Sequence, residues 1–177
     1  PLSSSPFWQP KNISGLDIDK DYLAGNNPLY QGVELDFPDA DEPLYFDRLV
    51  YTQSKPKINV YYASKKTGKK KKFRVKVGAE THTEPMANSL MASLGFNADI
   101  NQHRNKIKIY LGKTTFDEIK NGWRAYFSRQ QMHYRWEIED LLSEHGTDEK
   151  GEYMTFYEGT IEAKPKDISR IGPFRHD

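Results

Sequence analysis

A β-hairpin over residues 58–78 constrains the fold of this chain more than any other sequence feature. Residues 58–62 (Ile-Asn-Val-Tyr-Tyr) have strand composition, and a polar turn around Gly68 follows them. The return segment, residues 72–78, alternates between two kinds of side chain: apolar Phe73, Val75 and Val77, and basic Lys72, Arg74 and Lys76. Because successive side chains of a strand point to opposite faces, we predict one apolar face and one basic face.

Three further segments are rich in β-branched and aromatic residues and predict strands. They are residues 44–51, residues 105–111 and residues 153–161. Together with the hairpin, they indicate a sheet of about five strands.

Two segments between these strands have the apolar periodicity of helices. Residues 83–95 run from a threonine N-cap to a glycine stop, with an apolar stripe composed of Ala87, Leu90, Met91 and Leu94. The segment from Thr114 opens with a capping-box-like start, and its stripe consists of Phe116, Ile119, Trp123, Tyr126 and Phe127. We expect this second segment to form a helical insert over about residues 114–145.

The order of elements predicts an α+β fold, in which an antiparallel sheet of about five strands is packed by helices. Residues 1–45 contain many prolines and turn formers, so we expect an extended N-terminal arm that wraps the core. Residues 46–163 then form a single domain, as the length of 177 residues suggests. Residues 164–177 are expected to be a C-terminal connector.

Composition excludes several classes of protein. The chain has no Cys, which excludes disulfides, thiol catalysis and Cys-bound zinc. No apolar run approaches the roughly 20 residues of a membrane-spanning helix, and no Gly-x-Ser-x-Gly motif supports a hydrolase. The net charge of +1 indicates no partner by itself. No signal peptide is recognisable, so the sequence does not choose between a cytoplasmic and a periplasmic location.

The strongest candidate site combines a strand lysine with a helix carboxylate. Lys76 lies in the return strand of the hairpin, and Glu84 follows eight positions later in the first turn of the next helix. Since a charge near a packed face needs a partner, we predict that the two side chains meet. Kinase-like folds hold an ATP phosphate with such a pair. The alternative is that Lys76 is a solvated strand residue and Glu84 an acid favoured by the helix dipole.

The segment from Phe73 to Phe96 resembles part of the HipA-like and related kinase-like proteins. It is also similar to a poorly characterised bacterial family with a Lys-Val-Gly…His-Thr-Glu-Pro…Leu-Gly-Phe core. The matching motifs are Lys76-Val77-Gly78, His82-Thr83-Glu84-Pro85 and Leu94-Gly95-Phe96. The resemblance covers about residues 58–111, and it implies a kinase N-lobe-like fold that binds Mg-ATP. By the same resemblance, Lys76 contacts the ATP phosphates and Glu84 orients it.

The sequence departs from that family in its catalytic parts. No glycine-rich phosphate loop precedes Lys76, and no catalytic Asp with a following metal-binding Asn is recognisable. We therefore expect that the catalytic lobe is absent from this chain, that the chain alone is not catalytic, and that it works with the remainder of a larger polypeptide or a protein partner.

Two other functions remain open. The first is a non-enzymatic protein-interaction module, favoured by the arm and by the separation of a basic hairpin from the acidic residues of 137–162. The second is nucleic-acid binding through the hairpin of residues 64–76, where aromatic residues interleave with lysines. The possible polyanion contacts are Lys65, Lys66, Lys69, Lys70, Lys71 and Lys72. The near-zero net charge argues against a dedicated nucleic-acid binder.

The sequence predicts no metal site. His133 and Glu137 are four positions apart, as ligands on a helix can be, but no second His lies at ligand spacing. Residues 17–21 begin like a calcium loop, but Tyr22 stands where Gly is required and Pro28 where Glu is required. His82 lies close to Glu84 in sequence and is expected to couple to that site.

Overall fold

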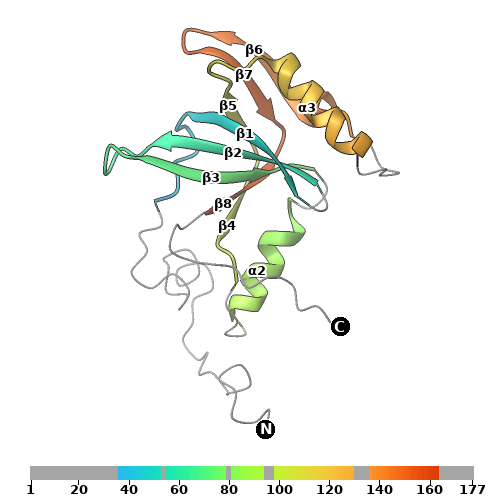
Figure 1. The fold of residues 1–177 in the computed structure, drawn as a ribbon. Coiled ribbons are helices and arrows are strands. Elements are labelled where there is room, and N and C mark those ends of the chain that lie inside the picture. Colours follow the sequence, from blue (N-terminus) through green and yellow to red (C-terminus); the bar gives the residue numbers. More distant parts are fainter. Residues whose placement is uncertain (1–35, 53–54, 79–80, 94–97, 130–135, 164–177) are drawn as a thin grey trace.

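Eight strands form one curled sheet, and two α-helices pack against it, in the residues that the computed structural model describes (Figure 1). These residues are 36–52, 55–78, 81–93, 98–129 and 136–163. The strand order across the sheet is β4-β8-β3-β2-β1-β5-β7-β6. The strands are β1 (Leu44–Thr52), β2 (Lys55–Ala63), β3 (Lys70–Lys76), β4 (Asn101–Arg104), β5 (Ile107–Tyr110), β6 (Leu142–Asp148), β7 (Gly151–Phe156) and β8 (Gly159–Ala163).

The α+β class is confirmed, but the sheet is larger than the expected five strands and is not purely antiparallel. β1 and β5 are parallel, with Leu44 opposite Ile109, and all other neighbouring strands are antiparallel. The single strand expected over residues 153–161 is two strands, β7 and β8, joined by a turn at Tyr157 and Glu158. β4 and β6 were not predicted.

The hairpin of β2 and β3 has the predicted alternation. Gly68 lies in its turn with a φ of 66°, a left-handed conformation that glycine adopts without steric cost. One face of the two strands is buried in the core, through Ile58, Val60, Tyr62, Phe73, Val75 and Val77. The opposite face carries Arg74 and Lys76, which are only partly exposed, so this face is not simply solvated.

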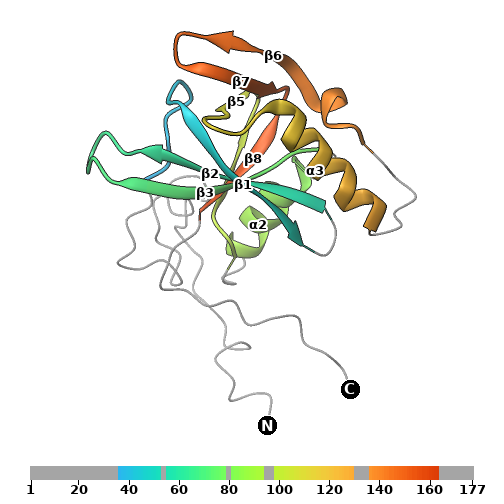
Figure 2. The same cartoon turned by 45° about the horizontal axis from the view of Figure 1, so that its top comes forward.

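Helix α3 (Phe116–Arg129) covers the apolar side of the curled sheet and packs against β1 and β7 (Figure 2). The capping box is confirmed: Thr115 N–H donates to Glu118, and Glu118 N–H donates to the Thr115 hydroxyl. The predicted stripe is buried, and Trp123 Nε1–H donates to the Trp136 carbonyl oxygen at 2.9 Å.

The helical insert is shorter than predicted. α3 ends at Arg129, a single 3₁₀ turn (η4, Ile138–Leu141) follows, and residues 142–148 form β6. The prediction of helix to about residue 145 is wrong because residues 142–148 pair with β7, and that tertiary pairing outweighs local preference. His133 lies outside the described residues. So do residues 1–35, which make up most of the expected arm, and residues 164–177, which were expected to form the connector.

The apolar stripe of helix α2 (Thr83–Ser93) does not face the core. Its stripe residues Ala87, Leu90 and Met91 are exposed, whereas Glu84 and Asn88 are partly buried. The physical reason is that the sheet face beside α2 is polar and charged, so the polar side of the helix stabilises the contact. Gly95, the predicted stop, lies outside the described residues. In the described part of the chain, no helix has both the length and the apolar character needed to cross a membrane.

Candidate functional site

Lys76 and Glu84 meet, as the sequence predicts. Lys76 is the last residue of β3, and Glu84 lies in the first turn of α2, which follows after a short connection. Nζ of Lys76 donates directly to Oε1 of Glu84. The side chains are 13% and 27% exposed, so the ion pair is partly shielded from water. The interpretation of Lys76 as a solvated strand residue is therefore wrong.

A second carboxylate, from Glu162 on β8, completes the environment of Lys76. Its Oε2 lies 2.7 Å from Lys76 Nζ, and its Oε1 lies 3.7 Å from Arg74 Nη1. The Glu162 side chain is fully buried. A buried carboxylate is stable only when cations or donors compensate its charge, and here two cations of β3 do so.

The sheet register explains why these charges lie together. Arg74 is directly opposite Glu162, and Glu162 is opposite Asn101 on β4. On the other side of β3, Arg74 is opposite Asn59 on β2. One row of polar side chains therefore crosses four strands on the face that α2 partly covers.

Among the described residues, three cations and two carboxylates lie on this row and beside it, and we call this group the polar layer. Its charged members are Lys57, Arg74, Lys76, Glu84 and Glu162. Burial, together with repulsion from Lys76 and Arg74, lowers the pKa of Lys57. An anion placed near Lys57 and Lys76 would reduce this repulsion.

Several amides of the polar layer have unmet hydrogen-bonding capacity. Among the described residues, the Asn59 Oδ1, Asn88 Nδ2 and both side-chain polar atoms of Asn101 are buried without a hydrogen-bond partner. Each such group costs about 1–3 kcal/mol if it stays unsatisfied. Buried polar groups of native proteins normally have a partner, so these amides indicate a place for water or a polar ligand.

The Lys-rich hairpin turn is a less concentrated cationic surface than its sequence suggests. Lys65 lies 3.4 Å from Glu42, and Lys72 lies 3.1 Å from Asp47. Lys70 Nζ lies 4.3 Å from the centre of the Tyr61 ring. The lysines that the sequence groups together therefore have different partners, and Lys66 and Lys69 are exposed beside them.

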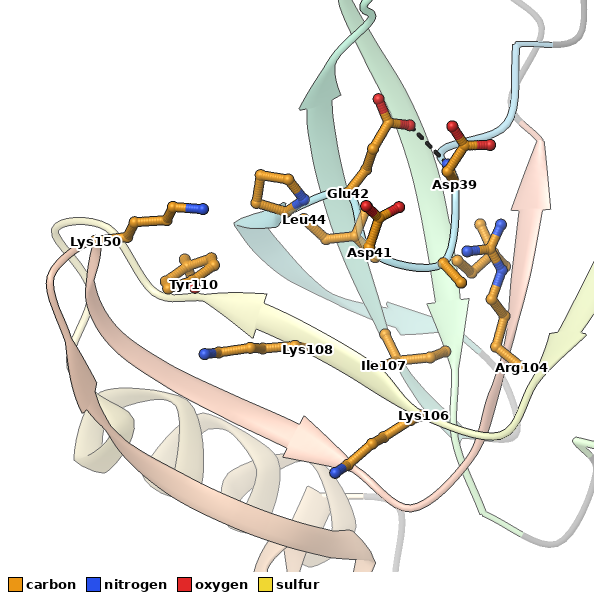
Figure 3. Close-up of a pocket in the computed structure, with 13 residues that line it drawn as sticks. Asp39, Asp41, Glu42, Leu44, Arg104, Lys106, Ile107, Lys108, Tyr110 and Lys150 are labelled. Atoms are coloured by element: carbon orange, nitrogen blue, oxygen red, sulfur yellow. Dashed lines mark hydrogen bonds between the residues drawn. The ribbon is translucent and has the colours of Figure 1, made fainter.

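A groove of about 180 Å³ lies between the segment before β1 and β5 (Figure 3), and Ile161, the neighbour of Glu162, also lines it. The acidic side chains of the segment before β1 line one side, and basic side chains of β5 and its surroundings line the other. These residues are Asp39, Asp41 and Glu42, and Arg104, Lys106, Lys108 and Lys150.

The basic side of the groove is already compensated in part. Lys108 Nζ donates to Asp148 at 2.6 Å, and this hydrogen bond raises the pKa of Lys108 and lowers that of Asp148. Tyr110 O–H donates to the same Asp148 oxygen at 3.0 Å. The mixed charge of the groove selects no ligand class.

Sequence reasoning identified Lys76 and Glu84 but missed the role of Glu162. The available signal was the alternation of Thr160 and Glu162 with apolar Ile161 and Ala163 in the last strand. This pattern places a carboxylate on the face opposite the core, but it does not show that β8 lies beside β3. Comparisons of the chain with models of protein families, with curated proteins and with solved structures found no match.

Proposed function

We propose that this chain binds the phosphate groups of a nucleotide such as Mg-ATP through Lys76, as the nucleotide-binding lobe of a kinase-like protein. The observation that carries the proposal is the contact of Lys76 Nζ with Glu84 across β3 and α2. A lysine held in this way presents its charge in a fixed direction, which is what phosphate binding requires.

The charge balance of the polar layer supports an anionic ligand. Glu84 and Glu162 contact Lys76, and the pKa of Lys57 is lowered by burial and by the like charges of Lys76 and Arg74. A phosphate near Lys57 and Lys76 would relieve that repulsion and accept hydrogen bonds from both ammonium groups.

The buried amides support the same ligand class. Asn88 Nδ2 and Asn101 Nδ2 are donors without a partner among the described residues. Phosphate oxygens accept hydrogen bonds from such amides.

Thermal unfolding of the full chain with and without Mg-ATP tests the proposal. Ligand binding to the native state stabilises it by about 2.7 kcal/mol at a ligand concentration 100 times the dissociation constant. We expect the midpoint of the wild type to rise and the midpoint of Lys76→Met to be unaffected by Mg-ATP. Inorganic triphosphate, measured in parallel, separates recognition of phosphate from recognition of the whole nucleotide.

Lys72→Met is the matched control, because Lys72 lies on the same strand but is exposed and paired with Asp47. Its response to Mg-ATP should equal that of the wild type. If Lys76→Met does not fold, Lys57→Met replaces it. No stabilisation of the wild type at millimolar Mg-ATP would refute the proposal, as would an equal response of Lys76→Met.

A protein-interaction module is the second candidate function, and the outer face of α2 favours it. Met86 is 69% exposed, Leu90 58% and Met91 41%. Apolar side chains that gather on an exposed helix face are typical of protein-binding surfaces. Leu90→Lys should abolish association with a partner or with the remainder of a larger polypeptide, as measured by sedimentation velocity, and it should leave Mg-ATP binding unchanged.

A further inference from the structure

Two histidines and a glutamate from three separate segments converge beside the polar layer. His82 lies just before α2, His103 lies on β4, and Glu158 lies in the turn between β7 and β8. Their ligand atoms all lie within 4.8 Å of one another. His82 Nε2 lies 2.6 Å and His103 Nε2 lies 3.5 Å from the same oxygen, Glu158 Oε2.

We propose that His82, His103 and Glu158 bind a divalent transition-metal ion, with Zn²⁺ as the expected occupant. Two imidazole nitrogens and one carboxylate oxygen match the ligand preference of zinc. Calcium and magnesium prefer sites made of oxygen ligands only, so this set selects against them. Three protein ligands leave a fourth position open for water or another ligand.

The distances fit such an ion after a small adjustment. Zinc bonds of about 2.0–2.1 Å at tetrahedral angles separate ligand atoms by about 3.4 Å. The separation between His103 Nε2 and Glu158 Oε2 already has this value, and that between His82 Nε2 and Glu158 Oε2 is shorter. Because the side chain of His82 is 66% exposed, it can move outward to admit the ion.

The second observation is a ring nitrogen that has no well-formed hydrogen bond. Nε2 of His103 is buried, and 3.5 Å from Glu158 Oε2 it makes no well-formed hydrogen bond to a described residue. The rings of His82 and His103 are in contact, with their centroids 4.3 Å apart, and the Nε2 atoms of both lie near Glu158 Oε2. A metal ion at that point would use the nitrogen that is otherwise unsatisfied.

The carboxylate is held in place by neighbouring groups. The Thr81 hydroxyl donates to Glu158 Oε1 at 3.1 Å, which leaves Oε2 directed at the histidines. The Thr160 hydroxyl donates to the Thr81 carbonyl oxygen at 2.8 Å, and both threonines are buried. Hydrogen bonds of this kind orient metal ligands in known sites.

The register places this cluster at the margin of the polar layer. Thr160 of β8 lies opposite Lys76 on one side and opposite His103 on the other. The ion would therefore lie across one strand from Lys76, and His82 precedes Glu84 by two residues. The metal proposal depends only on the three ligands and holds whether or not a nucleotide binds.

A calorimetric titration of the metal-free full chain with Zn²⁺ tests the proposal. A second titration, with Co²⁺, is measured by the visible absorption of the bound ion. We expect one ion per chain in the wild type. Loss of a group that only orients a ligand typically weakens metal binding about 10–100-fold. His82→Ala removes a direct ligand, so its affinity should fall at least about 100-fold. Thr81→Val should weaken binding less, by about 10-fold.

His145→Ala is the matched control. His145 Nε2 lies 2.9 Å from Glu152 Oε1, so it is a histidine–glutamate pair outside the cluster. Its removal should leave Zn²⁺ affinity unchanged. His82 is exposed, and its substitution should not affect folding, which circular dichroism checks. The proposal is overturned if the wild type does not bind Zn²⁺ at micromolar concentration, or if His82→Ala binds as tightly as the wild type.

Discussion

Replacing Glu162 by glutamine should destabilise the fold strongly. The substitution keeps the shape of the side chain but removes a fully buried charge that lies near Arg74 and 2.7 Å from Lys76. Removing one partner of a buried ion pair typically costs about 3–5 kcal/mol. Because Lys76 retains Glu84 as a partner, we expect a loss at the lower end, about 3 kcal/mol.

Urea denaturation at neutral pH measures this loss. With a urea dependence of about 2 kcal/mol per M, a loss of 3 kcal/mol lowers the midpoint by about 1.5 M. Asp47→Asn is the control, because it removes the partner of exposed Lys72. An exposed pair contributes about 0–1 kcal/mol, so the control should lower the midpoint by less than about 0.5 M.

A double-mutant cycle separates the ion pair from other effects of the substitution. If Glu162 and Lys76 interact, the stability losses of Glu162→Gln and Lys76→Met are not additive. Their sum should differ from the loss of the double variant by at least about 1 kcal/mol. The reasoning would be refuted if Glu162→Gln were no more destabilising than Asp47→Asn. It would also be refuted if the two substitutions were additive.

Two further substitutions test other parts of the fold. Burial opposes ionisation of Asp36, but the hydrogen bond from Ser64 and nearby lysines lower its pKa below the usual 3.8. Asp36→Asn should therefore lower the free energy of unfolding above about pH 4. This difference from the wild type should shrink as acid protonates Asp36. A difference in unfolding free energy that does not depend on pH would contradict this reasoning. Gly159→Ala should cost about 1–3 kcal/mol, because a Cβ there would lie 2.6 Å from Ile107 Cδ1 and 3.0 Å from the Lys76 carbonyl oxygen. An unchanged urea midpoint for Gly159→Ala would contradict that packing.

The elements that could be predicted from the sequence are those whose signal is local. The hairpin of β2 and β3 has strict alternation and a turn glycine, and α3 has both a capping box and a continuous apolar stripe. β6 has no such signal, because its residues 142–148 are mostly polar and depend on pairing with β7. β4 is equally dependent on its partner β8.

The site was predicted to the extent that its residues are near in sequence. Lys76 and Glu84 are eight positions apart, and one strand–helix connection brings them together. Glu162 and Glu158 reach the same face only because β8 lies between β3 and β4. No local pattern encodes that strand order, so the second carboxylate and the histidine–glutamate cluster could not be derived from spacing.

The orientation of α2 has a consequence for how the molecule opens. Its apolar residues Met86, Leu90 and Met91 are exposed, so burial of these side chains contributes little to holding the helix on the sheet. Contacts such as that of Glu84 with Lys76 fasten it instead. The hydrophobic core cluster of the described residues, which includes Ile58, Val75 and Ile161, contains no residue of α2, so we expect α2 to open as a cooperative unit separate from global unfolding. We expect the amides of α2 to exchange with solvent faster than those of the central strands.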